Sequence, residues 1–223
     1  MTALMAGATG LIGYELARHW TGPGNAVLLL RRVANAVNGL SGLSGPSGPK
    51  LSPLLVDYAA LPALPNADWA FCCLGTTMAQ AGSQAAFRAV DHDAVLAFAH
   101  AARAAGVKRF AMVSALGANA DAGSFYSRTK GQAEKAVAAV GFDSLIIARP
   151  SLLAGDRSAL GQPMRRGEHL ALRVSLFAGQ LIPLAWRPVE AAVVARALLR
   201  AVQEGQPGLR VLSSAQLQVL GSP

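Results

Sequence analysis

A tyrosine and a lysine four residues apart, Tyr126 and Lys130, are the side chains in this sequence best suited to carbonyl chemistry. Both fall near the start of an expected helix, where this spacing places them on one face. A free tyrosine has a pKa near 10, so lowering it by three units requires roughly 4 kcal/mol of differential stabilisation. The Lys130 ammonium and the helix N-terminus can supply part of it. The spacing alone arises readily by chance, but Ser114, twelve residues earlier at the end of an expected strand, favours a catalytic Ser-Tyr-Lys set.

A glycine-rich segment between the first expected strand and helix has the pattern of a phosphate site. Glycines stand at Gly7, Gly10 and Gly13, a GxxGxxG spacing rather than the GxGxxG of other dinucleotide-binding proteins. Glycine allows a tight turn, close approach of the backbone to a pyrophosphate, and close packing of the helix on the sheet. A plain turn is the alternative. The segment predicts a nucleotide cofactor site that also includes Thr9, Leu11 and Ile12.

Two arginines after the second expected strand bear on which nucleotide binds. Arg31 and Arg32 stand where an NAD-binding protein usually carries an acidic residue that accepts from the ribose 2′-hydroxyl. Arginine suits a 2′-phosphate instead, so the pair predicts NADP(H), with two solvated arginines as the alternative. Asp57, closing the third expected strand, could accept from the adenine amino group or could cap a turn.

The end of the fourth expected strand should run along the cofactor. Its residues there are Leu74, Gly75, Thr76 and Thr77. The preceding pair Cys72-Cys73 has no partner histidine or metal spacing, so both cysteines are expected to be packing residues. The four histidines show no ligand spacing either, and no metal site is expected.

Apolar strands and helices alternate along the chain up to Pro150. Such alternation predicts an α/β fold with a doubly wound parallel sheet, Rossmann-like, and helices on both faces. The expected strands are 2–6, 26–30, 54–57, 69–74, 108–114 and 144–148, and the expected helices are 11–20, a long one ending at Gly106, and 124–140. A Gly/Ser/Pro-rich loop is expected at 38–50. Further on, helices at 170–180 and 188–204 and a strand at 209–212 are expected.

Length and composition indicate one domain, residues 1–223, in which 151–223 form the substrate side. The chain has 52% hydrophobic and 14% charged residues and lacks the apolar run of about 18 residues that a membrane span needs. Adjacent cysteines form no disulfide framework, so a cytoplasmic protein is expected. The net charge of +8 is scattered without interleaved aromatics, which disfavours nucleic acid and suits a phosphate-bearing small ligand. A monomer or homodimer is expected.

Several motifs in order resemble the atypical short-chain dehydrogenases/reductases, and within them the HIV Tat-interactive-protein-like oxidoreductases. They are GATGLIG, FCCLGTT, Val90-Asp91, AGVKRFAMVSALGA, FYSRTKGQAEKAV and ARPSLLAGDR, which cover the chain to about Arg157. The resemblance implies an NADPH site, a Ser-Tyr-Lys set at Ser114, Tyr126 and Lys130, and a substrate segment that begins at Pro150. Two residues depart from the group: Ala115 replaces a second Ser or Thr of many relatives, and Asp91 replaces an active-site Asn.

The resulting hypothesis is an NADP(H)-dependent oxidoreductase that transfers a hydride between the nicotinamide C4 and a small carbonyl or alcohol substrate. Tyr126 would pass the proton, Lys130 would bind the nicotinamide ribose, and Ser114 would orient the oxygen. One alternative is a regulatory protein that binds NADPH without turnover. Another is a nucleotide-sugar epimerase or dehydratase. Only 73 residues follow Pro150, which is little for the substrate lobe that such enzymes use, and this counts against that alternative.

Overall fold

The computed structural model describes residues 1–21, 24–31, 51–154 and 183–222. The loop expected at 38–50 and the helix expected at 170–180 lie outside the described residues, as does Arg32.

A parallel sheet of seven strands forms the centre of the described structure, in the order β3-β2-β1-β4-β5-β6-β9. Every neighbouring pair in it runs parallel. The strands are β1 Thr2–Ala6, β2 Asn25–Leu30, β3 Leu51–Leu55, β4 Trp69–Cys72, β5 Arg109–Val113, β6 Ser144–Arg149 and β9 Gly208–Ser213. A separate parallel pair of two-residue strands joins β7 (Leu153–Ala154) to β8 (Val189–Glu190).

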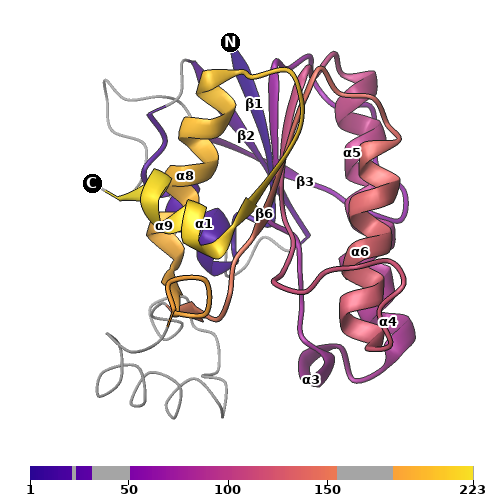
Figure 1. Cartoon of the computed structure of the whole chain (residues 1–223). Helices are drawn as coiled ribbons and strands as arrows, with labels where there is room; N and C mark the ends of the chain where they lie inside the picture. The colour runs from indigo at the N-terminus through magenta and orange to yellow at the C-terminus, as the bar shows by residue number, and fades with distance from the viewer. Residues whose placement is uncertain (22–23, 32–50, 155–182, 223) are drawn as a thin grey trace.

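Helices cover both faces of the sheet and make a three-layer α/β/α arrangement (Figure 1). On one face lie α1 (Leu11–Arg18), α8 (Ala191–Glu204) and α9 (Ser214–Gly221); on the other lie α5 (Ala94–Ala104) and α6 (Phe125–Ala138). Because side chains alternate along a strand, β4 supplies both cores: Phe71 packs beneath α1 and α8, whereas Ala70 and Cys72 pack beneath α5. The arrangement confirms the predicted doubly wound parallel fold.

The strand β3 corrects one expected boundary. It spans Leu51–Leu55 and includes Pro53, whereas the sequence predicted a strand at 54–57. A proline cannot donate to a sheet ladder, so a strand is not expected around it, but β3 is an edge strand, where this is tolerated. The helix expected at 188–204 likewise begins later, at Ala191, because the residues before it form β8.

The long helix expected before Gly106 is divided into three segments. It comprises α4 (Gln84–Arg88), a π-helical turn η1 (Ala89–Asp93) and α5. The short helix α3 (Met78–Ala81) precedes them and was not predicted. Single π turns inserted in α-helices occur frequently at functional sites. The turn η1 carries the buried Asp91.

Candidate functional site

The glycine segment forms a tight turn between β1 and α1, packed against the end of β4. Gly7 has φ +81, and a Cβ there would lie 2.5 Å from the carbonyl carbon of Cys73. A Cβ on Gly13 would lie 2.1 Å from the Gly7 oxygen. Gly10 donates its N–H to that same oxygen at 3.0 Å and caps α1. Backbone therefore lines this turn, as a pyrophosphate site requires.

The other predicted residues of the glycine segment, Thr9, Leu11 and Ile12, differ in how far they are exposed to solvent. The side chain of Thr9 is exposed, whereas those of Leu11 and Ile12 are buried in the core between α1 and the sheet. Only the backbone amides of these two buried residues, in the first turn of α1, could meet a cofactor phosphate.

The predicted cofactor residues Arg31 and Asp57 follow β2 and β3. Arg31 follows β2 and is exposed. Asp57 is also exposed, and its Oδ1 accepts from the Ala59 N–H at 2.9 Å, which is the turn-capping role. The contact with adenine stays a prediction.

Tyr58 is a residue of this region that the sequence interpretation missed. Its buried hydroxyl donates to the Leu29 carbonyl at 3.3 Å. Burial raises the pKa of Tyr58, and a hydrogen bond with the Gly7 backbone offsets part of that rise. Tyr58 thus ties the end of β2 to the glycine turn; an aromatic residue directly after Asp57 was the available signal.

The segment after β4 connects this turn to a buried ion pair. The Thr76 N–H donates to Asp91 Oδ2 at 2.8 Å, while Thr77 caps α3 by accepting from the Gln80 N–H at 3.1 Å. Leu74 is buried and Gly75 is exposed. A Cβ on Gly75 would lie 3.4 Å from Asp91 Oδ1 and 3.6 Å from Lys130 Nζ, so this backbone passes close to both groups.

Lys130 and Asp91 form the centre of the candidate site. Lys130 Nζ on α6 lies 2.7 Å from Asp91 Oδ1 on η1, and the two side chains are 6% and 0% exposed. Burial alone would lower the pKa of the Lys130 ammonium, but the adjacent Asp91 carboxylate more than offsets this and raises that pKa. Lys130 is therefore a charged donor held in an otherwise buried position.

The two remaining members of the predicted set lie nearby. Tyr126, one helical turn before Lys130, is half-buried with its ring centroid 5.4 Å from that of Phe87. Its interaction with Lys130 is a further cause of the raised lysine pKa. Ser114 follows β5 with its backbone N–H bonded to the Ala148 carbonyl at 2.7 Å. Its buried Oγ has no hydrogen-bond partner among the described residues, which suits a group that meets a ligand.

The adjacent cysteines are packing residues by their environment. Cys72 is buried in β4, and burial raises its pKa to about 12. Burial also raises the pKa of Cys73. A thiol kept neutral in this way is a poor nucleophile.

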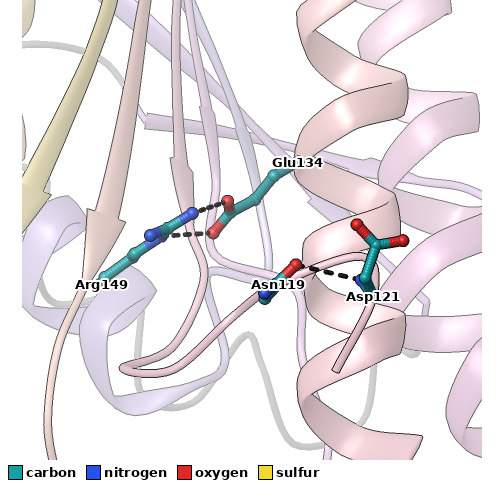
Figure 2. Close-up of polar contacts among 4 residues, drawn as sticks. All are labelled: Asn119, Asp121, Glu134 and Arg149. Atoms are coloured by element: carbon teal, nitrogen blue, oxygen red, sulfur yellow. Dashed lines mark hydrogen bonds and ion pairs between the residues drawn. The ribbon is translucent and has the colours of Figure 1, made fainter. Parts of the chain in front are cut away.

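A bidentate ion pair fixes α6 to the sheet beside the site (Figure 2). Arg149, at the end of β6, donates from Nε to Glu134 Oε1 at 3.0 Å and from Nη2 to Oε2 at 2.5 Å. Glu134 lies one turn beyond Lys130 on α6, and Pro150 follows Arg149. The carbonyl of Pro150 accepts from the Leu116 N–H at 2.9 Å. The sequence interpretation missed this pair, because its members stand on different elements.

The loop between β5 and α6 packs directly on the helix that carries Tyr126 and Lys130. Asn119 Oδ1 accepts from the Asp121 N–H at 3.0 Å (Figure 2), and the backbone N–H of Asn119 donates to the Ser127 carbonyl at 3.1 Å. A Cβ on Gly131 would lie 2.2 Å from the Ala120 nitrogen, so glycine is required for this approach.

Glu134→Gln is expected to lower the free energy of unfolding by about 1–3 kcal/mol, because Arg149 then loses one charge-assisted partner while 33% of its side chain is exposed. Urea denaturation of Glu134→Gln, Arg149→Lys and the double variant measures the coupling. Lysine keeps the charge and loses the planar fork, so the two losses should overlap. Strictly additive losses would contradict a direct interaction.

In the described part of the chain, none of the helices combines the length and the apolar character that a membrane span requires. No group of three or more His, Cys, Asp and Glu side chains among the described residues could hold a metal ion.

Comparison with known proteins identifies the family. A family described as NAD(P)H-binding matches residues 7–175. Protein HTATIP2 of Rattus norvegicus is 37% identical over 171 residues, covering 75% of this chain and 66% of that protein, just under two thirds of its length. Protein FMP52, mitochondrial, of Eremothecium gossypii is 31% identical over 220 residues, covering 97% of this chain and 96% of that protein.

Solved structures show the same fold at low sequence identity. DesIV, a dTDP-glucose 4,6-dehydratase from Streptomyces venezuelae, superposes with a TM-score of 0.70 at 18% identity, covering 99% of this chain and 80% of that one. MoeE5 in complex with UDP-glucose and NAD has a TM-score of 0.68 at 20% identity and covers 95% and 75% of the two chains. At these identities the likeness concerns the fold alone.

The names of the fungal relatives correct the expected cytoplasmic location, because they are given as mitochondrial proteins. That expectation depended on two adjacent cysteines, which argue against a disulfide framework but do not distinguish one reducing compartment from another. The resemblance predicted from the motifs is confirmed. The chain belongs to the NAD(P)H-binding family and, within it, to the atypical short-chain dehydrogenases/reductases.

Proposed function

We propose that this protein is an NADP(H)-dependent oxidoreductase acting on a small carbonyl or alcohol substrate. The observation that carries the proposal is the buried Ser114 Oγ, which has no partner in the described part of the chain. It stands at the end of β5, next in the sheet to β4, whose following residues contact the Asp91–Lys130 pair. A desolvated hydroxyl without a partner is costly unless a ligand completes it.

The chain fits a dinucleotide at the glycine turn, since a Cβ at Gly7 or Gly13 would clash with neighbouring backbone, so that only glycine allows the tight turn and close helix packing that a pyrophosphate site uses. When bound, the nicotinamide supplies or accepts the hydride at C4. In the proposed mechanism Ser114 donates to the substrate oxygen and holds it near Tyr126. Tyr126 passes a proton to that oxygen during reduction, or accepts it during oxidation. Lys130 binds the nicotinamide ribose and supplies positive charge beside the phenol.

For the nucleotide, the exposed Arg31 supports NADP(H), since its guanidinium can make charge-assisted bonds to a 2′-phosphate. NADPH is expected to bind at least about tenfold more tightly than NADH, a difference of about 1.4 kcal/mol. Arg31→Ala together with Arg32→Ala should remove the difference. Fluorescence titration of both nucleotides measures it, and equal affinities in the wild type would overturn the assignment.

The proposal also assigns residues 151–223 to the substrate side of one domain. The described part of this region contributes β7, β8, α8, β9 and α9. Ser214 Oγ on α9 donates to Ser151 Oγ at 3.0 Å, which ties the segment after Pro150 to the C-terminal helix.

The experiment that tests the function begins with the purified protein. Mass and absorbance identify any nucleotide that co-purifies, and a panel of aldehydes and ketones is then screened for NADPH oxidation. NADPH binding followed by saturable, carbonyl-dependent oxidation supports the proposal. NADPH binding without turnover of any panel member would favour the regulatory alternative, and no binding of NADPH would exclude both.

A further inference from the structure

We propose that Asp91 is a positioning residue that joins the Lys130 ammonium to the loop after β4 and keeps that ammonium charged and fixed in the site. The proposal rests on the proposed function, because it concerns the lysine assigned to the nicotinamide ribose. It adds a residue whose side chain acts through another rather than on the substrate.

The two oxygens of the Asp91 carboxylate have different partners. Oδ1 lies 2.7 Å from Lys130 Nζ, and Oδ2 accepts from the Thr76 N–H at 2.8 Å. One fully buried side chain therefore connects η1 with both α6 and the loop after β4. Any shift of the loop is transmitted to the position of the ammonium through this carboxylate.

The local backbone is built around this contact. Asp91 stands inside the π-helical turn η1, and single π turns of this kind are rare and occur frequently at functional sites. Gly75 passes close enough that a side chain there would contact both the carboxylate and the ammonium. The contact between Asp91 and Lys130 therefore lies between the π-helical turn η1 and the backbone of Gly75.

Charge balance distinguishes aspartate from a neutral residue of the same size. An asparagine could accept equally well from the Thr76 N–H, but it could not neutralise a buried ammonium. The other ionisable groups that interact with Lys130 are Tyr126 on α6 and Cys72 on β4. A phenol and a thiol carry negative charge only after losing a proton, unlike a carboxyl group at neutral pH. Burial raises the thiol pKa of Cys72 to about 12, so that thiol stays uncharged. Asp91 is thus the group that keeps Lys130 protonated.

The sign of the pH dependence follows. Because Asp91 raises the pKa of Lys130 in the folded protein, the ion pair persists below the ordinary lysine pKa and is lost only as the pH rises through the raised value. Without the carboxylate, burial is the largest remaining influence on Lys130 and lowers that pKa, so the ammonium loses its proton at lower pH.

The chain contains four lysines, Lys50, Lys108, Lys130 and Lys135, so lysine labelled with ¹³C at Cε gives a spectrum that can be assigned. Lys130→Arg identifies the signal of interest, and the exposed Lys108 and Lys135 serve as references. In the wild type the Lys130 signal should titrate above the references. In Asp91→Asn its midpoint should fall below them, by at least about one pH unit.

Asp93→Asn is the matched control, because Asp93 lies two residues away, is 59% exposed and pairs with His92. It removes the same charge from the same turn and should leave the Lys130 titration unchanged. If Asp91→Asn does not fold, the wild-type titration decides: a Lys130 midpoint at or below the references overturns the proposal.

Binding of NADPH supplies the second measurement. Relative to the wild type, Asp91→Asn should lose about tenfold in NADPH affinity between neutral pH and a pH one unit above its own Lys130 midpoint, where about nine tenths of its Lys130 is neutral. Identical pH dependence of the two proteins, with NADPH bound by both, overturns the role of Asp91. Failure of the wild type to bind NADPH while the lysine midpoint still falls in Asp91→Asn would instead reject the proposed function and leave the charge-holding role supported.

Discussion

Tyr126→Phe is expected to lower NADPH-dependent carbonyl reduction by about 10²-fold or more, while the fold and the affinity for NADPH stay unchanged. The substitution removes the phenolic oxygen and keeps the ring, so the packing of Tyr126 against Phe87 is preserved. A positioned general acid contributes on the order of 10²–10⁴ to rate, and its loss should reduce kcat and kcat/KM together. Steady-state kinetics with a substrate from the carbonyl panel measures the change.

The melting temperature and the dissociation constant for NADPH are the controls for this variant. If both match the wild type, the loss of rate belongs to the proton-transfer step rather than to folding or cofactor binding. Turnover by Tyr126→Phe at the wild-type rate would falsify the mechanism and leave the fold assignment intact.

Gly7→Ala is expected to have the largest effect on folding and cofactor binding. Gly7 has φ +81, where an L side chain is strained, and its Cβ would lie 2.5 Å from the backbone of Cys73. Backbone atoms at the end of β4 cannot rotate away, so β1 or β4 must shift. We compare Gly7→Ala with a Gly→Ala variant at a position that has the same φ but open space around the new Cβ. Gly7→Ala should lose about 2–4 kcal/mol more of the free energy of unfolding than that variant.

Gly141→Ala provides that matched variant, since Gly141 also has φ +81 and a Cβ there meets nothing within 4 Å. The difference between the two variants in urea denaturation isolates the close approach from the backbone strain. Where Gly7→Ala still folds, NADPH affinity should fall at least tenfold, or about 1.4 kcal/mol. Equal stability of the two variants would show that the glycine turn is not packed as described.

Much of the fold could be predicted because its signals are local. The apolar runs that became β1, β4, β5 and β6 reflect burial on both faces of a parallel sheet, and their alternation with helices predicted the doubly wound topology. The glycine segment was recognisable because backbone conformation and close approach restrict residue type at single positions. The spacing of Tyr126 and Lys130 likewise placed both on one face of α6.

Other features depended on position in the assembled fold. Proline within β3 was tolerable only because that strand lies at the edge of the sheet, and η1 could not be distinguished from ordinary helix by hydrophobic periodicity. Asp57 has a side chain that suits either an adenine contact or a turn, and its bond to the Ala59 N–H supports the turn.

The features that could be predicted from the sequence differ physically from those that only the tertiary structure decided. Residue type along the chain determines which segments bury their side chains and where the backbone needs glycine, and these local preferences were enough for the strands, the helices and the glycine turn. Ion pairs such as Asp91–Lys130 and Glu134–Arg149 join charged groups on separate elements, where each residue alone is equally compatible with a solvated surface. Only packing of the helices on the sheet brings these groups together, and it buries the Asp91 and Lys130 side chains almost completely, which makes that pair part of the candidate site.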